Sequence, residues 1–342
     1  MGKFDKKRKS EMNRTEEYND NPFDRIFADY DERRRRETEA ALKEANINPD
    51  LIQSDRYMPH KGQPAENTIS HGVNTASYIN TEQRRKKNLY SSANQRVQFG
   101  SATIIGKREY QQDALATSFV PGEEKYIAVL CDGMGGMNGG EQASALCVDI
   151  MINAFNSGVD FVPMFFQENI IEIDDAVASI CDEYGNPIGA GSTLISVIID
   201  KDDFYWASVG DSHIYVIRGD EMLRVNTEHN YMLELQRAVS RGEITQEEAL
   251  SDPKKDALIS YMGMGGVYLM DINQKPLKLY KNDIIVLCSD GLYRALSDDE
   301  ILDTVKRYIS SPQLTADVLV DMVQKKDRPH QDNTSVIVVK YQ

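Results

Sequence analysis

The chain has 342 residues, 41% of them hydrophobic, which suffices for one large domain or two modest ones with a sizeable core. Its net charge of −15 is uneven, with about +2 in residues 1–95 and about −17 in residues 96–342, which argues against nucleic acid as the main partner. There is no apolar run of about 18 residues and no apolar stretch after the charged start MGKFDKKRKS, so neither a membrane span nor a secretory signal is supported and a cytoplasmic protein is expected.

Residues 1–95 have the composition of a polar N-terminal extension. Residues 1–20 are almost wholly polar and are expected to be disordered. Asn21-Pro22 provides a helix cap followed by proline, and the apolar spacing that begins at Phe23 predicts an amphipathic helix over about 22–45. Residues 46–95 are rich in Asn, Ser, Thr, Gln and Pro and indicate a linker. The helix would pack on its own domain or bind a protein partner, and the pattern leaves both open.

From residue 96 onward, short runs with strand composition recur between turn signals. These runs cover 97–105, 126–131, 193–199, 204–209, 213–218, 283–288 and 334–341. Helical spacing occurs between them over 143–154, 170–180 and 314–323, and capping boxes begin at Thr245 and Ser297. Because strict alternation of strand and helix is not sustained, the order predicts an antiparallel α+β layered domain.

The four cysteines are scattered along the chain and include no C-x-x-C pair. Cys131 and Cys288 lie inside apolar runs. We therefore expect all four, including Cys147 and Cys181, to be buried reduced thiols, as is usual in a cytoplasm.

Four aspartates stand where predicted strands begin or end. They occur in Asp132-Gly133, Gly210-Asp211-Ser212, Ser289-Asp290-Gly291 and Asp332-Asn333. Each one alone is a common turn signal, but neighbouring glycines let the backbone bend so that carboxylates from different strands converge. Converging aspartate oxygens without paired Cys or His favour Mg²⁺ or Mn²⁺. Spacing alone leaves turns and a metal site equally supported.

Two further polar groups have more than one interpretation. Arg108 is either a surface residue or, beside metal-bound carboxylates, a bidentate clamp for a phosphate group. A Ser-His-Asp arrangement could be drawn from Asp211, Ser212 and either His213 or His229. It is disfavoured because adjacent strand residues point to opposite faces and no Gly-x-Ser-x-Gly sequence occurs.

Eight short motifs, in this order, resemble the type 2C metal-dependent protein Ser/Thr phosphatase family in its bacterial style. They are Arg108-x-x-x-Gln112-Asp113, Asp132-Gly133-Met134-Gly135-Gly136, Gly191-Ser192-Thr193, Gly210-Asp211-Ser212, Glu228-His229-Asn230, Gly242-Glu243-Ile244-Thr245, Ser289-Asp290-Gly291 and Asp332-Asn333. The resemblance covers residues 96–342, which would form the catalytic domain. It implies two central antiparallel β-sheets packed as a sandwich and flanked by pairs of antiparallel helices, with a metal site at one end.

The resemblance also implies how that site is built. Two Mn²⁺ or Mg²⁺ ions would bind per domain, together with a weaker third. Asp132 would bridge the first two ions, and the Gly133 carbonyl would reach the second. Asp290 and Asp332 would hold the first ion, and Asp211, with Asp290, would serve the third.

The implied reaction is hydrolysis of phosphoserine and phosphothreonine in proteins by a water that two metal ions activate. Arg108 would bind the substrate phosphate, and Asp113 would orient water from the outer shell. Residues 229–266 would form a flap that shapes substrate access. The partners would be a phosphoprotein and a cognate Ser/Thr kinase in bacterial signalling.

This sequence departs from the family pattern at three places. Gln112 stands where some members have Glu, and Met134 replaces a histidine that eukaryotic members use as a candidate general acid. Tyr261 and Met262 stand where the flap usually carries an arginine. These departures keep a second function open, a weakly active or inactive phosphatase-fold module that recruits a partner through its N-terminal extension.

Overall fold

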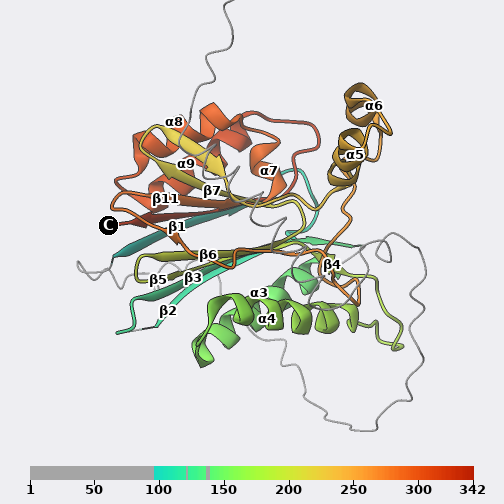
Figure 1. Ribbon diagram of the computed structural model, residues 1–342, viewed down its shortest axis with the longest axis horizontal. Helices are drawn as coiled ribbons and strands as arrows, with labels where there is room; N and C mark the ends of the chain where they lie inside the picture. Colours follow the sequence, from blue (N-terminus) through green and yellow to red (C-terminus); the bar gives the residue numbers. More distant parts are fainter. Residues whose placement is uncertain (1–95, 121, 136–138) are drawn as a thin grey trace, which may run out of the picture. The chain divides into compact units, whose positions relative to one another are not determined.

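Two antiparallel sheets face each other in the part of the chain that the computed structural model describes, which comprises residues 96–120, 122–135 and 139–342 (Figure 1). All of these residues belong to one compact unit. The helix predicted over about 22–45 and the linker predicted to follow it lie outside the described residues.

Hydrogen bonding between neighbouring strands defines the order of the strands in each sheet. The first sheet runs β1 (Val97–Ile104), β12 (Thr334–Tyr341), β11 (Ile284–Cys288), β7 (His213–Arg218) and β8 (Glu221–Arg224). The second sheet runs β10 (Leu277–Lys278), β6 (Asp203–Val209), β5 (Leu194–Asp200), β3 (Lys125–Met134) and β2 (Asp113–Val120). Two short strands extend it, because β4 (Gly191–Ser192) pairs with β3 and β9 (Asp271–Ile272) pairs with β6.

A pair of helices covers the outer face of each sheet (Figure 1). α3 (Gly139–Ser157) and α4 (Val162–Ala178) cover the second sheet, whereas α8 (Asp298–Tyr308) and α9 (Pro312–Lys325) cover the first. The single turn α7 (Asp290–Tyr293) follows β11, and α5 (Tyr231–Ser240) and α6 (Gln246–Ser251) lie to one side of the sandwich. The capping boxes predicted at Thr245 and Ser297 are both formed, at the starts of α6 and α8.

The alternation of side chains along the strands produces the layers. On β3, Ile127, Val129 and Cys131 are fully buried against α3 and α4, so the residues between them face the other sheet. On β12, Val336 and Val338 pack in the same way with α8 and α9. The predicted α+β sandwich is confirmed. β2 is not predicted, because its residues are only partly buried and show no alternation.

The cysteines are all free, but one expectation about them is wrong. Cys131, Cys147 and Cys288 are buried, whereas Cys181 is exposed. Cys181 follows the end of α4, beyond the buried part of its apolar stripe, and its thiol donates to the Ser179 carbonyl at 3.3 Å. None of the described helices has the length and apolarity needed to cross a bilayer.

Candidate active site

Strand pairing in the first sheet brings three of the predicted aspartates to one end of the sandwich. The last residue of β11, Cys288, pairs with Val336 near the start of β12 and with the first residue of β7. Asp290 follows β11, Asp332 precedes β12 and Asp211 precedes β7. These three residues therefore flank strand ends that lie side by side.

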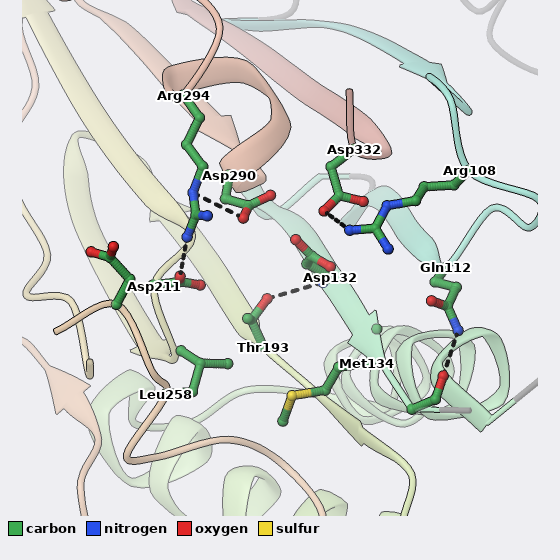
Figure 2. A pocket seen from close by; sticks show the side chains of 13 residues that line it. Arg108, Gln112, Asp132, Met134, Thr193, Asp211, Leu258, Asp290, Arg294 and Asp332 are labelled. Carbon is green, nitrogen blue, oxygen red and sulfur yellow. Dashed lines mark hydrogen bonds and ion pairs between the residues drawn. The ribbon is translucent and has the colours of Figure 1, made fainter. Parts of the chain in front are cut away.

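The second sheet contributes the other two predicted acids at the same end. Asp113, the first residue of β2, pairs directly with Asp132 near the end of β3. A cavity of 340 Å³ opens here, and Figure 2 shows Asp132, Asp290 and Asp332 grouped around it. The cavity is lined by Arg108, Gln112, Asp132, Gly133, Met134, Gly135, Thr193, Asp211, Asp256, Leu258, Asp290, Arg294 and Asp332. Of the predicted site residues, only Asp113 is absent from this lining, because it lies behind the others.

The end of β3 is held in place by its backbone. The Asp132 N–H donates to Thr193 Oγ1 at 2.9 Å, and the Thr193 N–H donates back to the Asp132 carbonyl at 2.8 Å. At Gly133 a Cβ would lie 2.0 Å from the Gly140 carbonyl oxygen, so only glycine fits where α3 begins. The carboxylate of Asp132 therefore enters the cavity from a fixed backbone.

Burial and mutual repulsion raise the pKa values of the clustered acids. Burial raises the pKa of Asp132 well above its usual range, and the nearby Asp113, Asp290, Asp211 and Asp332 raise it further. Burial is also the main reason that the pKa of Asp113 rises to about 7 and that of Asp211 to about 6. Without a cation the folded site therefore disfavours the ionised form of these carboxylates, and a bound cation would stabilise that form.

Oxygen atoms in this cluster are left without partners. Asp290 Oδ1 and Asp113 Oδ1 are buried, and neither has a hydrogen-bond partner within the described ranges. The other oxygen of Asp113 accepts from Ser289 Oγ at 2.8 Å. Unpartnered carboxylate oxygens without thiolate or imidazole neighbours suit Mg²⁺ or Mn²⁺, so the donor set fits the predicted ions.

Two arginines form ion pairs with three of these aspartates. No three acidic, histidine or cysteine side chains in the described part of the chain are close enough to form a ready-made metal site. Arg108 Nη2 lies 2.6 Å from Asp332 Oδ2. Arg294 Nε lies 3.1 Å from Asp290 Oδ2, and its Nη2 lies 3.6 Å from Asp211 Oδ2. The sequence analysis missed Arg294, although its position four residues after Asp290 at a helix start could have indicated it.

The three departures from the family pattern all lie at or near the cavity. Gln112 does not reach the acids, because its amide donates to the Gly135 carbonyl at 3.3 Å. Met134 lines the cavity with a thioether, which has no proton to donate. A Cβ at Gly191 would lie 2.8 Å from Met134 Cε and 2.9 Å from Tyr261 Cδ2, so both side chains pack over this glycine.

The alternative Ser-His-Asp arrangement is not formed. Ser212 Oγ hydrogen-bonds Thr193 Oγ1 at 2.9 Å. His213 bonds Glu228 and Tyr215 through its two ring nitrogens, each at 2.7 Å. Neither contact gives Ser212 a base, and the other candidate, His229, accepts the Gly210 backbone N–H at its Nδ1 at 3.2 Å.

The segment predicted as a flap ends in a loop held by one carboxylate. α5, α6 and the chain after them bring Asp256 and Leu258 to the cavity. Asp174 of α4, 1% exposed, then accepts four backbone N–H groups from the following loop at 2.6–2.9 Å. These donors belong to Gly263, Met264, Gly266 and Val267.

Asp174→Asn is therefore expected to loosen this loop. An amide offers one acceptor oxygen for the four donors, and each lost bond to a charged acceptor costs about 1.5–3 kcal/mol. Hydrogen exchange should quicken at the four loop amides while the β3 amides stay protected. Asp175→Asn, on the exposed face of the same helix, is the matched control. Unchanged exchange in the Asp174 variant would show that the carboxylate does not hold the loop.

Comparison with known proteins identifies the family to which this chain belongs. A family model described as "Protein phosphatase 2C" matches residues 102–324. The chain therefore belongs to the protein phosphatase 2C family. The family resemblance and the enzyme class predicted from the sequence are confirmed.

Particular relatives agree with this family. "Serine/threonine phosphatase stp" of Listeria innocua is 26% identical over 223 residues, which cover 64% of this chain and 85% of that one. The solved serine/threonine phosphatase of S. agalactiae superposes with a TM-score of 0.61 at 24% identity, covering 72% of this chain and 100% of that one. The catalytic domain of the protein phosphatase PstP, solved in complex with 2 manganese ions, has a TM-score of 0.57 at 22% identity and covers 71% and 97% of the two chains.

Proposed function

We propose that this chain removes phosphate from phosphoserine and phosphothreonine in proteins, using two divalent cations, Mn²⁺ or Mg²⁺, bound in the described cavity. The observation that carries this proposal is the meeting of Asp132, Asp290 and Asp332 from two sheets at one cavity in a protein phosphatase 2C fold. The manganese ions in the solved PstP domain support the choice of metal.

Four residues would hold the ions. Asp132 would contact both, the Gly133 carbonyl the second, and Asp290 and Asp332 the first. Bound there, the ions would lower the pKa of a water molecule enough to supply a nucleophile near neutral pH. Asp290 Oδ1, which is buried and has no hydrogen-bond partner among the described residues, would then coordinate an ion.

The remaining residues would bind and orient the reactants. Arg108 stands at the cavity with its side chain 57% exposed, so its guanidinium can turn from Asp332 and grip two phosphate oxygens at once. Asp113, fixed by Ser289 behind the cavity, would orient water through its free oxygen. Because Met134 cannot donate a proton, the proton for the departing serine or threonine oxygen would come from water or from another group.

The setting we propose is bacterial signalling in the cytoplasm, opposite a cognate Ser/Thr kinase. The buried free thiols of Cys131, Cys147 and Cys288 support a reducing compartment. The N-terminal extension would supply a contact for a protein partner, and the acidic charge of residues 96–342 disfavours nucleic acid.

Metal removal tests the proposed function. A chelator should abolish turnover of a phosphothreonine peptide, and added Mn²⁺ should restore it. Asp290→Asn should lower Mn²⁺-dependent turnover by about 10²–10³-fold, since a ligand that stabilises transition-state charge is weakened. Asp299→Asn makes the same change at an exposed position of α8 and should leave turnover unaltered.

If the folded, unaltered chain shows no metal-dependent turnover, the proposal is wrong. The chain would then be the binding module that the family departures kept open. Capture of a partner by the full chain, and its loss when residues 1–95 are removed, would identify that case.

A further inference from the structure

Arg294 occupies the space between two carboxylates that come from different turns. Its Nε contacts Asp290 Oδ2 at 3.1 Å, and its Nη2 approaches Asp211 Oδ2 at 3.6 Å. Figure 2 shows the guanidinium lying between the two acids, with a dashed line to each. The family resemblance assigns a weaker third metal ion to this pair of aspartates, so a guanidinium stands where that ion would bind. The Arg294 side chain is 51% exposed, close to the 57% of Arg108, but it contacts two carboxylates whereas Arg108 contacts one.

The backbone around Arg294 directs the side chain to this place. Its N–H donates to the Asp290 carbonyl at 3.0 Å, which puts the arginine one helical turn after the aspartate and on the same side. Its own carbonyl accepts a hydrogen bond from Arg328. Hydrogen bonds at both its N–H and its carbonyl therefore fix the backbone of Arg294.

Tyr293 fixes the α7 turn against the turn that carries Asp211. The Tyr293 hydroxyl donates to the Asp211 carbonyl at 3.1 Å. The Tyr293 ring stacks on His213 at 3.6 Å between centroids and 10° between planes. Tyr293 thus ties the α7 turn to the backbone of Asp211, and the Arg294 guanidinium bridges the two carboxylates.

A permanent positive charge at this point opposes a divalent cation in two ways. The guanidinium keeps its proton at any pH at which the protein is folded, so its charge is not removed. It also occupies one oxygen of each aspartate that an ion would need as a ligand. The acids at the other side of the cavity, Asp132 and Asp332, lie outside this contact.

We propose that Arg294 takes the place of a third divalent ion between Asp211 and Asp290, so that this chain binds two ions at the cavity and Asp211 is a partner of arginine. This inference rests on the proposed two-metal function. The proposed function requires two bound ions, whereas this inference concerns whether a third ion also binds.

Counting bound Mn²⁺ tests the inference. The full chain is stripped with a chelator, and equilibrium dialysis against Mn²⁺ then gives the ions bound per chain. Arg294→Ser removes the charge and should bind one more ion than the unaltered chain. Arg294→Lys keeps a charge and should bind no more. Adding Asp211→Asn to Arg294→Ser should remove the extra ion.

Two further variants keep the result interpretable. Arg237→Ser removes an arginine that pairs with Glu234 on the surface of α5, and it should not alter the count. Arg294→Gln retains length and hydrogen-bonding capacity without charge, so it replaces Arg294→Ser if that variant does not fold by circular dichroism.

Two outcomes would overturn the inference: an unchanged count in the uncharged variants, or an extra ion that persists with Asp211→Asn. The absolute count answers a separate question. Fewer than two ions on the unaltered chain would contradict the proposed function, whereas the difference between the variants would still decide the role of Arg294.

Discussion

Replacing Asp132 with asparagine is expected to lower Mn²⁺-dependent phosphatase turnover by about a thousandfold or more. The Asp132 carboxylate is the one predicted to contact both ions, and loss of metal stabilisation worth several kcal/mol corresponds to about tenfold in rate for each 1.4 kcal/mol. Its backbone is fixed by Thr193, so the variant should keep the position of the side chain. Initial rates on a phosphothreonine peptide at saturating Mn²⁺ measure the effect.

The same substitution should make the metal-free chain more stable. The pKa of Asp132 is raised in the folded state, so the folded chain binds this proton more tightly than the unfolded chain does. Metal-free stability contributed by this group therefore falls as pH rises above its ordinary value of 3.8, and asparagine removes that fall. At pH 7, well above this ordinary value, the metal-free variant should therefore be more stable than the unaltered chain.

Thermal unfolding with and without Mn²⁺ checks this second effect. The variant should melt higher than the unaltered chain in chelator, and it should gain less on addition of Mn²⁺. Asp149→Asn, on the exposed face of α3, should change neither activity nor melting. A variant that loses activity and also melts lower in chelator would show that the Asp132 side chain stabilises the metal-free fold, contrary to this prediction.

Gly100→Ala is expected to cost the most stability of any change proposed. A Cβ at Gly100 on β1 would lie 2.1 Å from the Pro312 carbonyl carbon and 2.2 Å from the Gln313 nitrogen, at the start of α9. These are backbone atoms, so α9 would have to move away from the sheet. Overpacking of this kind should cost about 3 kcal/mol or more, measured from the urea unfolding midpoint.

Gly219→Ala is the control that separates steric overlap from the backbone strain of replacing a glycine. Gly219 has a φ of +62° but no atom within 4 Å of an added Cβ. Its replacement should cost only about 1 kcal/mol, from backbone strain. Equal losses in the two variants would contradict the close approach of α9 to β1.

The predictions that succeeded rest on local patterns. The β3 run is recognisable because a continuous apolar stretch stops at Asp132-Gly133, and the α8 start because Ser297 and Glu300 form a capping box. The convergence of the aspartates was predictable in part, because strand ends of an antiparallel sheet meet at shared edges. Which ends meet was supplied by the family resemblance and not by spacing.

What the sequence could not show depends on contacts between distant segments. Asp174 looks like an ordinary polar position of α4, and only the folded loop reveals four amides directed at it. Arg294 matters because Asp211, 83 residues earlier, is brought beside it. β2 is missed because its small, half-buried side chains carry neither a strand nor a helix period.

The split origin of the acids has a mechanical consequence. Asp132 belongs to one sheet, whereas Asp290 and Asp332 belong to the turns of the other. Cations shared between these carboxylates would join the two halves of the sandwich as a reversible cross-link. Separating the sheets would then require the ions to leave first, so the metal-loaded chain would unfold slowly even where its equilibrium stability is modest. The site proposed for catalysis would thereby also control the lifetime of the folded protein.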